Sequence, residues 1–281
     1  MRVSIKLADT MTPGIFFIVV LLLPSLSFGE ELLMVTFEHA PHHYTENGNV
    51  TGGCTDMLRQ ILTGMGHKPV FRSMPWMRAQ EMLNRGDADG IYVYTQTRER
   101  LQTAYYSNPV SYITLTLFKR RCDAIQWNTL SDIRPYRVGA SGGYHYPDTF
   151  LKAAENGDFT LDYVFNNTPN LRNLRKLVAK RIDLFICNPE VCGIIMKKYA
   201  PEFDDLDYID KNVAPPMSLH VGFSKKLTNG RQIRDEFNKK FDEFLSSGQL
   251  KHIYDKYGMK PDYEKLGSKG IAISTEGRDW Q

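Results

Sequence analysis

A regular alternation of strand-like and helix-like segments, repeated twice, constrains the fold of this chain more than any other feature. Short stretches rich in β-branched and aromatic residues alternate with stretches whose apolar residues recur every three or four positions. Two such series in succession predict an α/β protein with largely parallel sheets. The first series has strands at 32–38, 68–74 and 90–97 and helices at 54–66 and 76–86; the second has strands at 136–141, 161–166 and 182–188 and helices at 146–157, 170–181 and 191–200.

A further strand and a long helix are predicted after the second series. The strand covers residues 217–226 and the helix covers residues 228–257. Ile233, Phe237, Phe241 and Phe244 recur at helical spacing and form an apolar stripe. Because such a stripe is stable only when it is buried, the tail must pack on the rest of the protein.

The N-terminus has the pattern of a secretory signal peptide. Arg2 and Lys6 precede an apolar run from Ile15 to Leu23, which breaks at Pro24 and is followed by small residues. This run is much shorter than the about 20 apolar residues that span a bilayer. We therefore expect a signal peptide over residues 1–29, cleavage near Gly29, and a soluble, exported mature protein.

The charge balance gives no indication of a nucleic-acid partner. Removal of residues 1–29 takes away Arg2, Lys6 and Asp9, which leaves 33 basic and 31 acidic side chains. Nucleic-acid-binding proteins usually carry a clear basic excess, because they must neutralise phosphates. We therefore expect no nucleic acid among the partners.

Export places the four cysteines in an oxidising compartment, where disulfides persist. Four cysteines allow three full pairings. Cys187 and Cys192 are close enough in sequence to bridge across a strand-to-helix turn, and the alternative for them is a pair of free buried thiols. Cys54 and Cys122 lie far apart in sequence. The candidate disulfide is therefore Cys187–Cys192.

Several motifs follow one another in a fixed order through residues 32–260. They are "EHAP" after the first strand, "GNVTGG" before the first helix, "PWMRAQEMLNRGDADG", "TQTRER", "YSNPV", "VGASGGYHY", "NLRNLRKLVAKRIDLFI" and "VGFSKK". Together they resemble the extracellular solute-binding proteins of family 3, the group typified by the polar amino-acid binding proteins of ABC transporters.

The resemblance implies an α/β, two-lobed periplasmic-binding-protein fold of type II with a ligand cleft between the lobes. It places lobe 1 at residues 30–111 and 220–265, lobe 2 at 117–214, two hinge crossings at 112–116 and 215–220, and a C-terminal tail at 266–281. A solute would bind between the lobes and close them. Open α/β sheets generally place ligands at the carboxyl ends of their strands, which agrees with this arrangement.

Arg100 is the candidate for holding a ligand carboxylate. A guanidinium can bind a carboxylate through two parallel hydrogen bonds, and Tyr94 and Thr95 lie at the end of the preceding strand. From the residues alone, Arg98 and Arg100 are more simply explained as solvated charges at a helix start. The resemblance implies the carboxylate role for Arg100, with the hydroxyl of Thr95 nearby, and no such role for Arg98.

Two further candidates lie at the strand-to-helix turn "SMPWMRAQ". Trp76 follows a proline at a position where the resemblance implies an aromatic ring packed on the ligand. The alternative is a core tryptophan that fills the top of the lobe. Arg78 either lines the cleft or lies on the surface.

The glycine-bearing turn "ASGGYHY" is the candidate contribution of lobe 2. It stands between a predicted strand and a predicted helix, and helix starts present free N–H groups to anions. Ser141, Gly142, Gly143 and Tyr144 would therefore complete the carboxylate site when the lobes close.

Asn188 departs from the pattern of the family. Typical amino-acid binders have an aspartate near this point, which accepts hydrogen bonds from the ammonium group of the ligand. Asparagine offers a carbonyl oxygen but no charge, and Glu190 is the candidate substitute. As an alternative, Asn188 caps the next helix, with Pro189 at its first position.

Three histidines, His39, His42 and His43, lie within "FEHAPHHYTENG" and raise the question of a metal. A metal site would need further ligands, and neither an H-x-x-x-H pattern nor a cysteine pair supplies them. We expect no metal and no other cofactor. The resemblance places His39 where a ring packs on the ligand, which would make binding depend on pH between about 5 and 8.

The expected function is periplasmic capture of a small, carboxylate-bearing, amino-acid-like solute, without a chemical step. The protein would act as a monomer that serves an ABC-transporter permease or a membrane sensor. One alternative is an enzyme, because the same fold hosts a periplasmic cyclohexadienyl dehydratase, which needs a general acid such as Asp183 or Glu190. The other is the sensing subunit of a signalling system.

Overall fold

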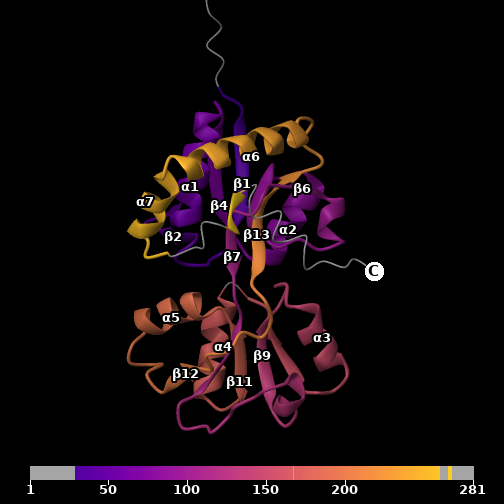
Figure 1. The fold of residues 1–281 in the computed structure, drawn as a ribbon, viewed down its shortest axis with the longest axis vertical. Helices are drawn as coiled ribbons and strands as arrows, with labels where there is room; N and C mark the ends of the chain where they lie inside the picture. The colour runs from indigo at the N-terminus through magenta and orange to yellow at the C-terminus, as the bar shows by residue number, and fades with distance from the viewer. Residues whose placement is uncertain (1–28, 167, 260–264, 268–281) are drawn as a thin grey trace, which may run out of the picture.

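The computed structural model describes residues 29–166, 168–259 and 265–267, which form two lobes joined by a pair of crossing segments (Figure 1). The predicted signal peptide, apart from Gly29, lies outside the described residues, and so does the predicted C-terminal tail beyond Gly267. No helix within the described ranges is long and apolar enough to cross a membrane.

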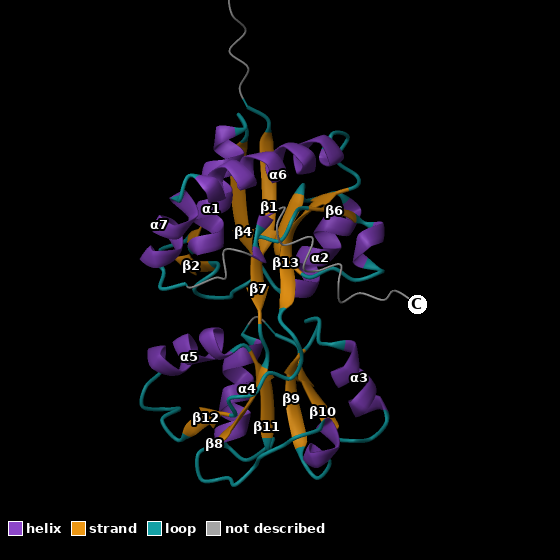
Figure 2. Ribbon diagram, in the orientation of Figure 1, coloured by secondary structure: helices purple, strands orange, loops and turns teal. Residues whose placement is uncertain are grey.

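The first lobe is built on a mixed sheet in the order β4-β1-β5-β13-β6, with β7 paired to β13 (Figure 2). Strand β1 is parallel to β4 and β5, whereas β13 is antiparallel to β5, β6 and β7. A small hairpin of β2 and β3 lies outside this sheet. The strands are β1 (Glu31–Thr36), β2 (Tyr44–Glu46), β3 (Asn49–Thr51), β4 (Lys68–Ser73), β5 (Gly90–Tyr94), β6 (Ala104–Tyr106), β7 (Ser111–Ile113) and β13 (Met217–Ser224).

Helices cover both faces of this sheet because alternate side chains of its strands are buried on opposite sides. In β1, Leu32 and Met34 belong to the core under α1, α6 and α7, while Val35 belongs to the core under α2. The helices are α1 (Gly53–Gly64), α2 (Trp76–Arg85), α6 (Gly230–Ser246) and α7 (Gln249–Lys256), with a short 3₁₀ helix η1 (Arg100–Gln102).

The second lobe has a five-stranded sheet in the order β10-β9-β11-β8-β12. Strands β9, β10 and β11 are parallel, and β8 is antiparallel to both β11 and β12. Helix α3 covers one face, and α4 and α5 cover the other. The elements are β8 (Thr116–Arg120), η2 (Leu130–Ile133), β9 (Arg137–Ser141), α3 (Asp148–Glu155), β10 (Thr160–Val164), α4 (Pro169–Val178), β11 (Leu184–Cys187), α5 (Pro189–Lys198) and β12 (Leu206–Tyr208).

Two details of the predicted fold are corrected. The sheets are mixed rather than largely parallel, because the strands next to the crossings run against the β-α-β series. The predicted helix over 228–257 is two helices, α6 and α7, because Gly248 between them has a left-handed backbone (φ 77°) that a continuing helix does not allow. The four apolar residues of its stripe are buried as expected.

The lobes are connected by two chain segments that run close together. The first leads from β7 through Thr114 and Leu115 into β8, and the second leads from Tyr208 back to β13. The segments are hydrogen-bonded to each other on both sides of the crossing, as β7 pairs with β13 and the N–H of Val213 donates to the carbonyl of Leu115 (2.8 Å). The two crossings therefore form a paired connection.

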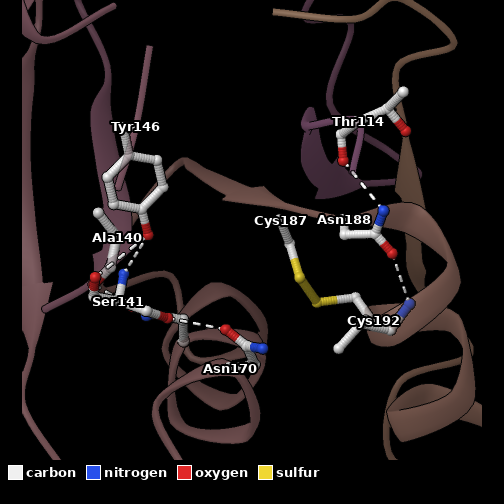
Figure 3. Close-up of a disulfide and its surroundings, with 10 residues drawn as sticks. Thr114, Ala140, Ser141, Tyr146, Asn170, Cys187, Asn188 and Cys192 are labelled. Carbon is white, nitrogen blue, oxygen red and sulfur yellow. Dashed lines mark hydrogen bonds between the residues drawn. A yellow bond between two sulfur atoms is a disulfide. The ribbon is translucent and has the colours of Figure 1, made fainter. Parts of the chain in front are cut away.

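Cys187, the last residue of β11, forms a disulfide with Cys192 in the first turns of α5 (Figure 3). Both cysteines are buried in the core under α4 and α5. Of the remaining cysteines, Cys54 is buried and Cys122 is exposed. The disulfide therefore ties a sheet strand to the start of the following helix.

We expect the unreduced, denatured mature protein to be alkylated at Cys54 and Cys122 only, and at all four cysteines after reduction. In the native protein, only Cys122 should react quickly, because Cys54 is buried. Reduction should lower the free energy of unfolding by about 2 kcal/mol, the loop-closure entropy of so short a loop. Peptide mass spectrometry measures the labelling, and alkylation of Cys187 or Cys192 without reduction would contradict the bridge.

Candidate functional site

A cavity of about 60 Å³ lies between the lobes, with its wall built from both lobes and both crossing segments. The first lobe forms one side of the cavity, the two crossing segments form its floor, and the second lobe forms the opposite side. The residues that line it are Phe37, His39, Trp76, Val93, Thr95 and Arg100 from the first lobe, Ile113, Leu115, Met217 and Leu219 from the crossings, and Tyr144, His145, Tyr146, Asn170, Ile186, Cys187 and Asn188 from the second lobe.

The half-buried guanidinium of Arg100 is the strongest charge on this wall. Its Nε donates to Gln80 Oε1 (3.0 Å) and its Nη1 donates to Thr95 Oγ1 (2.5 Å), which fixes the plane of the group. Within the described ranges, no carboxylate forms an ion pair with it. Burial lowers the pKa of Arg100 from its ordinary value and outweighs the opposing effects of Tyr94, Tyr106 and Glu99.

Aromatic rings support the Arg100 guanidinium. Its central carbon lies 4.7 Å from the ring centroid of Tyr94 and 5.5 Å from that of Trp76, both within the range of cation–π attraction. Tyr94 in turn stacks on Tyr106, with ring centroids 5.3 Å apart. Tyr94 itself does not line the cavity, so it acts as a support for Arg100 rather than as part of the predicted ligand wall.

A β-bulge in β5 brings Tyr94 under Arg100. Val93 has φ 58°, a left-handed conformation that is strained for a β-branched residue, and the register against β13 slips there. Tyr92 and Val93 consequently share the core under α1, α6 and α7, whereas Tyr94 turns to the core beside α2. Backbone strain of this kind persists where the surrounding structure enforces it, typically at functional sites.

Several contacts cross the cleft and hold the lobes together. The indole Nε1 of Trp76 donates to the carbonyl of Gly143 (2.8 Å), and Arg100 Nη2 donates to the same oxygen (3.5 Å). The rings of Phe37 and Tyr144 meet edge to face, with centroids 5.2 Å apart. The structure therefore shows the lobes in a closed arrangement.

The loop that carries the three histidines is held by the start of α1. The N–H groups of Gly53 and Cys54 donate to the carbonyls of Pro41 (3.0 Å) and His42 (2.9 Å), which satisfies donors that a helix start leaves free. Gly52, just before the helix, has φ 114°, and a Cβ there would lie 2.6 Å from the His42 carbonyl oxygen. The "TGG" motif therefore allows the loop to approach the helix.

The three imidazoles are buried but differ in charge. Burial lowers the pKa values of His39 and His43 well below the ordinary value of 6.5, and no described group is hydrogen-bonded to their ring nitrogens. For His42, burial also acts to lower the pKa, but the partners Cys54 and Glu190 outweigh it and raise the pKa to about 9. His42 is therefore the charged member of the group.

Glu190 is the partner of His42 across the cleft. Its carboxylate lies 3.7 Å from His42 Nε2, so the ion pair joins the histidine loop of the first lobe to α5 of the second. Glu190 does not line the cavity and is therefore not in position to substitute for an aspartate at the ligand. No group of three or more His, Cys, Asp or Glu side chains among the described residues is arranged to hold a metal ion.

The glycine-bearing turn of the second lobe differs from its prediction. Helix α3 begins only at Asp148, and the N–H groups of Ser141, Gly142 and Tyr144 donate to protein oxygens, so this segment is not a helix start with free donors. Ser141, Gly142 and Gly143 do not line the cavity, whereas Tyr144 does. The turn instead contributes the carbonyl of Gly143, which accepts a hydrogen bond from Trp76.

Asn188 occupies the cavity wall as a helix cap. Its Oδ1 accepts from the N–H of Val191 (2.9 Å), and its Nδ2 donates to the carbonyl of Thr114 in the first crossing (3.0 Å; Figure 3). The capping alternative is thus the one that the structure shows. The amide links α5 to the crossing segment.

The structure brings together six of the predicted ligand contacts. Arg100, Thr95, Trp76, His39 and Asn188 all line the cavity, together with Tyr144. Arg78 is exposed on α2 and does not line it.

Sequence reasoning missed the four apolar residues of the crossings and the pair His145 and Tyr146. The alternation of Ile113 with Leu115, and of Met217 with Leu219, was the available signal, because side chains two apart on a strand share a face.

The sequence profile of the bacterial extracellular solute-binding proteins, family 3, matches residues 33–260 of this chain. A search of curated protein sequences gave no significant match.

Solved structures share the fold at low sequence identity. An ancestral arginine-binding protein bound to arginine is 18% identical (TM-score 0.70; 82% of this chain and 99% of that chain covered). A structure from work on glutathione import by GshT and the cystine importer TcyBC of Streptococcus mutans is 17% identical (TM-score 0.73; 86% and 99%). A histidine kinase sensor domain similar to periplasmic binding proteins is 18% identical (TM-score 0.67; 81% and 95%). The predicted α/β fold of the type II periplasmic binding proteins is confirmed.

We expect the histidine contribution to the free energy of unfolding to be largest near pH 6.5. The raised pKa of His42 stabilises the protein fully below 6.5, and this stabilisation is lost as the pH rises toward about 9. The lowered pKa values of His39 and His43 act in the opposite sense, so their stabilisation is lost as the pH falls below 6.5. Urea unfolding across this range measures the profile.

The variant His42→Gln separates the alkaline side of this pH profile, which depends on His42, from the acidic side, which depends on His39 and His43. It should remove on the order of 2 kcal/mol at neutral pH, with most of the alkaline slope, because each pKa unit is about 1.4 kcal/mol and solvent near the half-exposed Glu190 screens part of it. Glu190→Gln should have a similar effect. An unchanged alkaline slope in both variants would contradict the ion pair.

Gly52→Ala should destabilise the protein and weaken ligand binding, because its Cβ would push the His42 carbonyl away from α1. We expect a loss of roughly 1 to 3 kcal/mol in urea unfolding. Gly48→Ala is the matched control: Gly48 also has a positive φ (79°), but a Cβ there meets nothing within 4 Å. Equal losses in the two variants would show that backbone strain alone, and not the contact with His42, explains Gly52.

Proposed function

The chain belongs to the bacterial extracellular solute-binding proteins, family 3, and on this basis we propose that it captures a small carboxylate-bearing solute, of about amino-acid size, by closure of its two lobes. The protein would bind the solute without changing it chemically. The proposed hinge is formed by the crossings at 112–116 and 215–220, which are paired with each other in the structure.

The main support for this proposal is that the half-buried guanidinium of Arg100 has no ion-pair partner among the described residues. A guanidinium that has lost water needs an anion. No described carboxylate lines the cavity beside Arg100, and its chain neighbour Glu99 acts on it only through space. Its Nη2 has only a long hydrogen bond to Gly143 (3.5 Å), while Nε and Nη1 are held by Gln80 and Thr95. A carboxylate in the cavity would complete the coordination with charge-assisted hydrogen bonds.

Binding and closure are linked because the cavity wall is shared between the lobes. Trp76 and Arg100 of the first lobe reach Gly143 of the second, and the His42–Glu190 ion pair forms a second bridge. A solute that contacts both walls binds the closed state better than the open one, so it shifts the population toward closure. This is the mode of action that we propose.

The destination of the solute is proposed from the family and from the signal-like N-terminus. The family is extracellular, and the structural relatives include proteins of ABC importers and a sensor domain of a histidine kinase. We therefore propose a periplasmic monomer that delivers its solute to an ABC-transporter permease or reports it to a membrane sensor. The cavity offers no observation that favours an enzyme.

Arg100→Ala should reduce the thermal stabilisation that carboxylate probes give to the purified mature protein to about a third or less of its wild-type value. A probe at about 100 times its Kd stabilises the folded state by about 2.7 kcal/mol, or roughly 5 to 10 °C for a chain of this size. Loss of the guanidinium should weaken binding by about 2 kcal/mol or more, a factor of about 30. Differential scanning fluorimetry with L-amino acids and small carboxylic acids measures the shifts.

Arg78→Ala is the matched control for Arg100→Ala. It removes the same charge from the same lobe, but Arg78 is exposed on α2 and does not line the cavity. We expect wild-type shifts in this variant and an intact circular dichroism spectrum in both. A full thermal shift in Arg100→Ala would contradict the carboxylate role.

A further inference from the structure

We propose that the ligand is a carboxylate without an ammonium group beside it, with an apolar or aromatic body. This inference rests on the proposed function, because it describes the solute that the Arg100 site would select. An α-amino acid would need acceptors for its ammonium group in addition to donors for its carboxylate. The wall of this cavity provides a cation and neutral donors, and none of the described residues that line it supplies a carboxylate to an ammonium group.

The side chain nearest to the expected ammonium position is already used by the protein. Both ends of the Asn188 amide are engaged, one with Val191 in α5 and the other with Thr114 in the crossing (Figure 3). Turning the amide toward a ligand would uncap α5 and leave a carbonyl of the crossing without its donor. Asn188 is therefore a structural link between the lobe and the hinge and not an ammonium acceptor.

The carboxylates nearest in sequence to Asn188 are also engaged elsewhere. Asp183 forms ion pairs with Arg120 (3.8 Å) and Arg137 (3.6 Å) at the other end of β11, and Glu190 faces His42. None of the described residues that line the cavity is an aspartate or a glutamate. An ammonium group in this cavity would therefore lose its water without a compensating anion, which costs several kcal/mol.

The polar groups that do face the cavity favour an anion. Ser141 donates to Asn170 Oδ1 (2.7 Å), which occupies one lone pair of that oxygen, while the NH₂ group of Asn170 remains a donor on the wall. Burial, together with the nearby charge of Arg100, lowers the pKa of His145, although Asp148 acts to raise it. His145 is therefore neutral at pH 7 and can donate to a carboxylate. A neutral imidazole gives at most one uncharged acceptor to an ammonium group.

Fixed charge around the cavity acts in the same direction. Arg100 is the charged side chain on the cavity wall, and the carboxylates of Glu99 and Asp148 act on Arg100 and His145 without lining the cavity. His42, which is also charged, lies beside the cavity residue His39, with ring centroids 5.4 Å apart. Glu190 balances His42 from its far side. A ligand ammonium would meet the uncompensated charge of Arg100, whereas a carboxylate would neutralise it.

The apolar and aromatic residues of the wall indicate the chemical nature of the ligand beyond its carboxylate. The floor of the cavity is formed by Ile113 and Leu115 of one crossing and by Met217 and Leu219 of the other. Aromatic rings of Phe37, Trp76 and Tyr144 form the sides. A hydrocarbon chain or a ring fits such walls, because it buries apolar surface without leaving polar groups unpaired.

Paired probes that differ only in the α-amino group test the inference on the mature protein. The first pair is 3-phenylpropionate and L-phenylalanine, and the second is 4-methylpentanoate and L-leucine. Isothermal titration calorimetry at about pH 7 gives the four affinities. We expect the acid without the amino group to bind at least about tenfold more tightly than the amino acid in each pair. The amines 2-phenylethylamine and 3-methylbutylamine should not bind.

The outcomes separate this inference from the proposed function. Tighter or equal binding of the amino acids, still dependent on Arg100, would overturn the inference and leave the proposed function standing. Binding of polar carboxylates alone, such as succinate, would overturn the apolar body. If no carboxylate binds at all, both the inference and the proposed function are overturned.

The variant Asn188→Asp tests directly whether a negative charge at this position changes the preference between the paired probes. Aspartate can still accept from Val191 and cap α5, but it adds the negative charge that an ammonium group needs. We expect this variant to shift the preference within each pair toward the amino acid by about tenfold or more, while Asn188→Ala weakens both members alike. An unchanged preference in Asn188→Asp would overturn the assignment of selectivity to Asn188.

Discussion

The unpaired guanidinium of Arg100 is the interaction on which the rest of the site depends. Its position follows from several independent elements: Gln80 of α2, Thr95 after β5, and the ring of Tyr94 below it. The left-handed Val93 is part of the same arrangement, because the bulge that it forms turns Tyr94 to that side of the sheet. A cation held so firmly and without an anion is preorganised for a ligand, since little freedom remains to be lost when the ligand binds.

In the proposed mode of action, closure of the lobes acts on this cation in two opposite ways. It removes water from Arg100, which is unfavourable as long as no carboxylate is present. It also forms the contacts of Trp76 with Gly143 and of His42 with Glu190, which are favourable. The balance between open and closed states therefore depends on the occupant of the cavity, and a carboxylate converts the unfavourable part into an attractive one. Selection of a closed state by a ligand requires this kind of differential interaction.

The sequence was informative where local pattern and chemistry coincide. Local pattern indicated both β-α-β series and made Cys187–Cys192 the candidate disulfide. The resemblance to the family, and not local pattern, implied the placement of Arg100, Trp76 and His39 on one cavity. The sequence was uninformative where distant segments decide. The bulge at Val93, which turns Tyr94 to the other face of the sheet, depends on the register against β13. The hydrogen bond from Asn188 to Thr114 joins residues of different segments. No local pattern contains such information, because register and crossing geometry arise only when both partners are in place.

In the histidine loop, too, the charge of each side chain depends on distant segments that local sequence does not reveal. Three similar side chains in a short sequence take two different protonation states, because His39 and His43 meet only other rings whereas His42 meets Cys54 and Glu190. The partner Glu190 comes from the opposite lobe, so this ion pair joins the two lobes. A metal would have required the three rings to converge on one point. Instead, one ring faces the cavity, one bridges the cleft, and one packs against Phe37 and Tyr92, which divides a single motif into three separate structural roles.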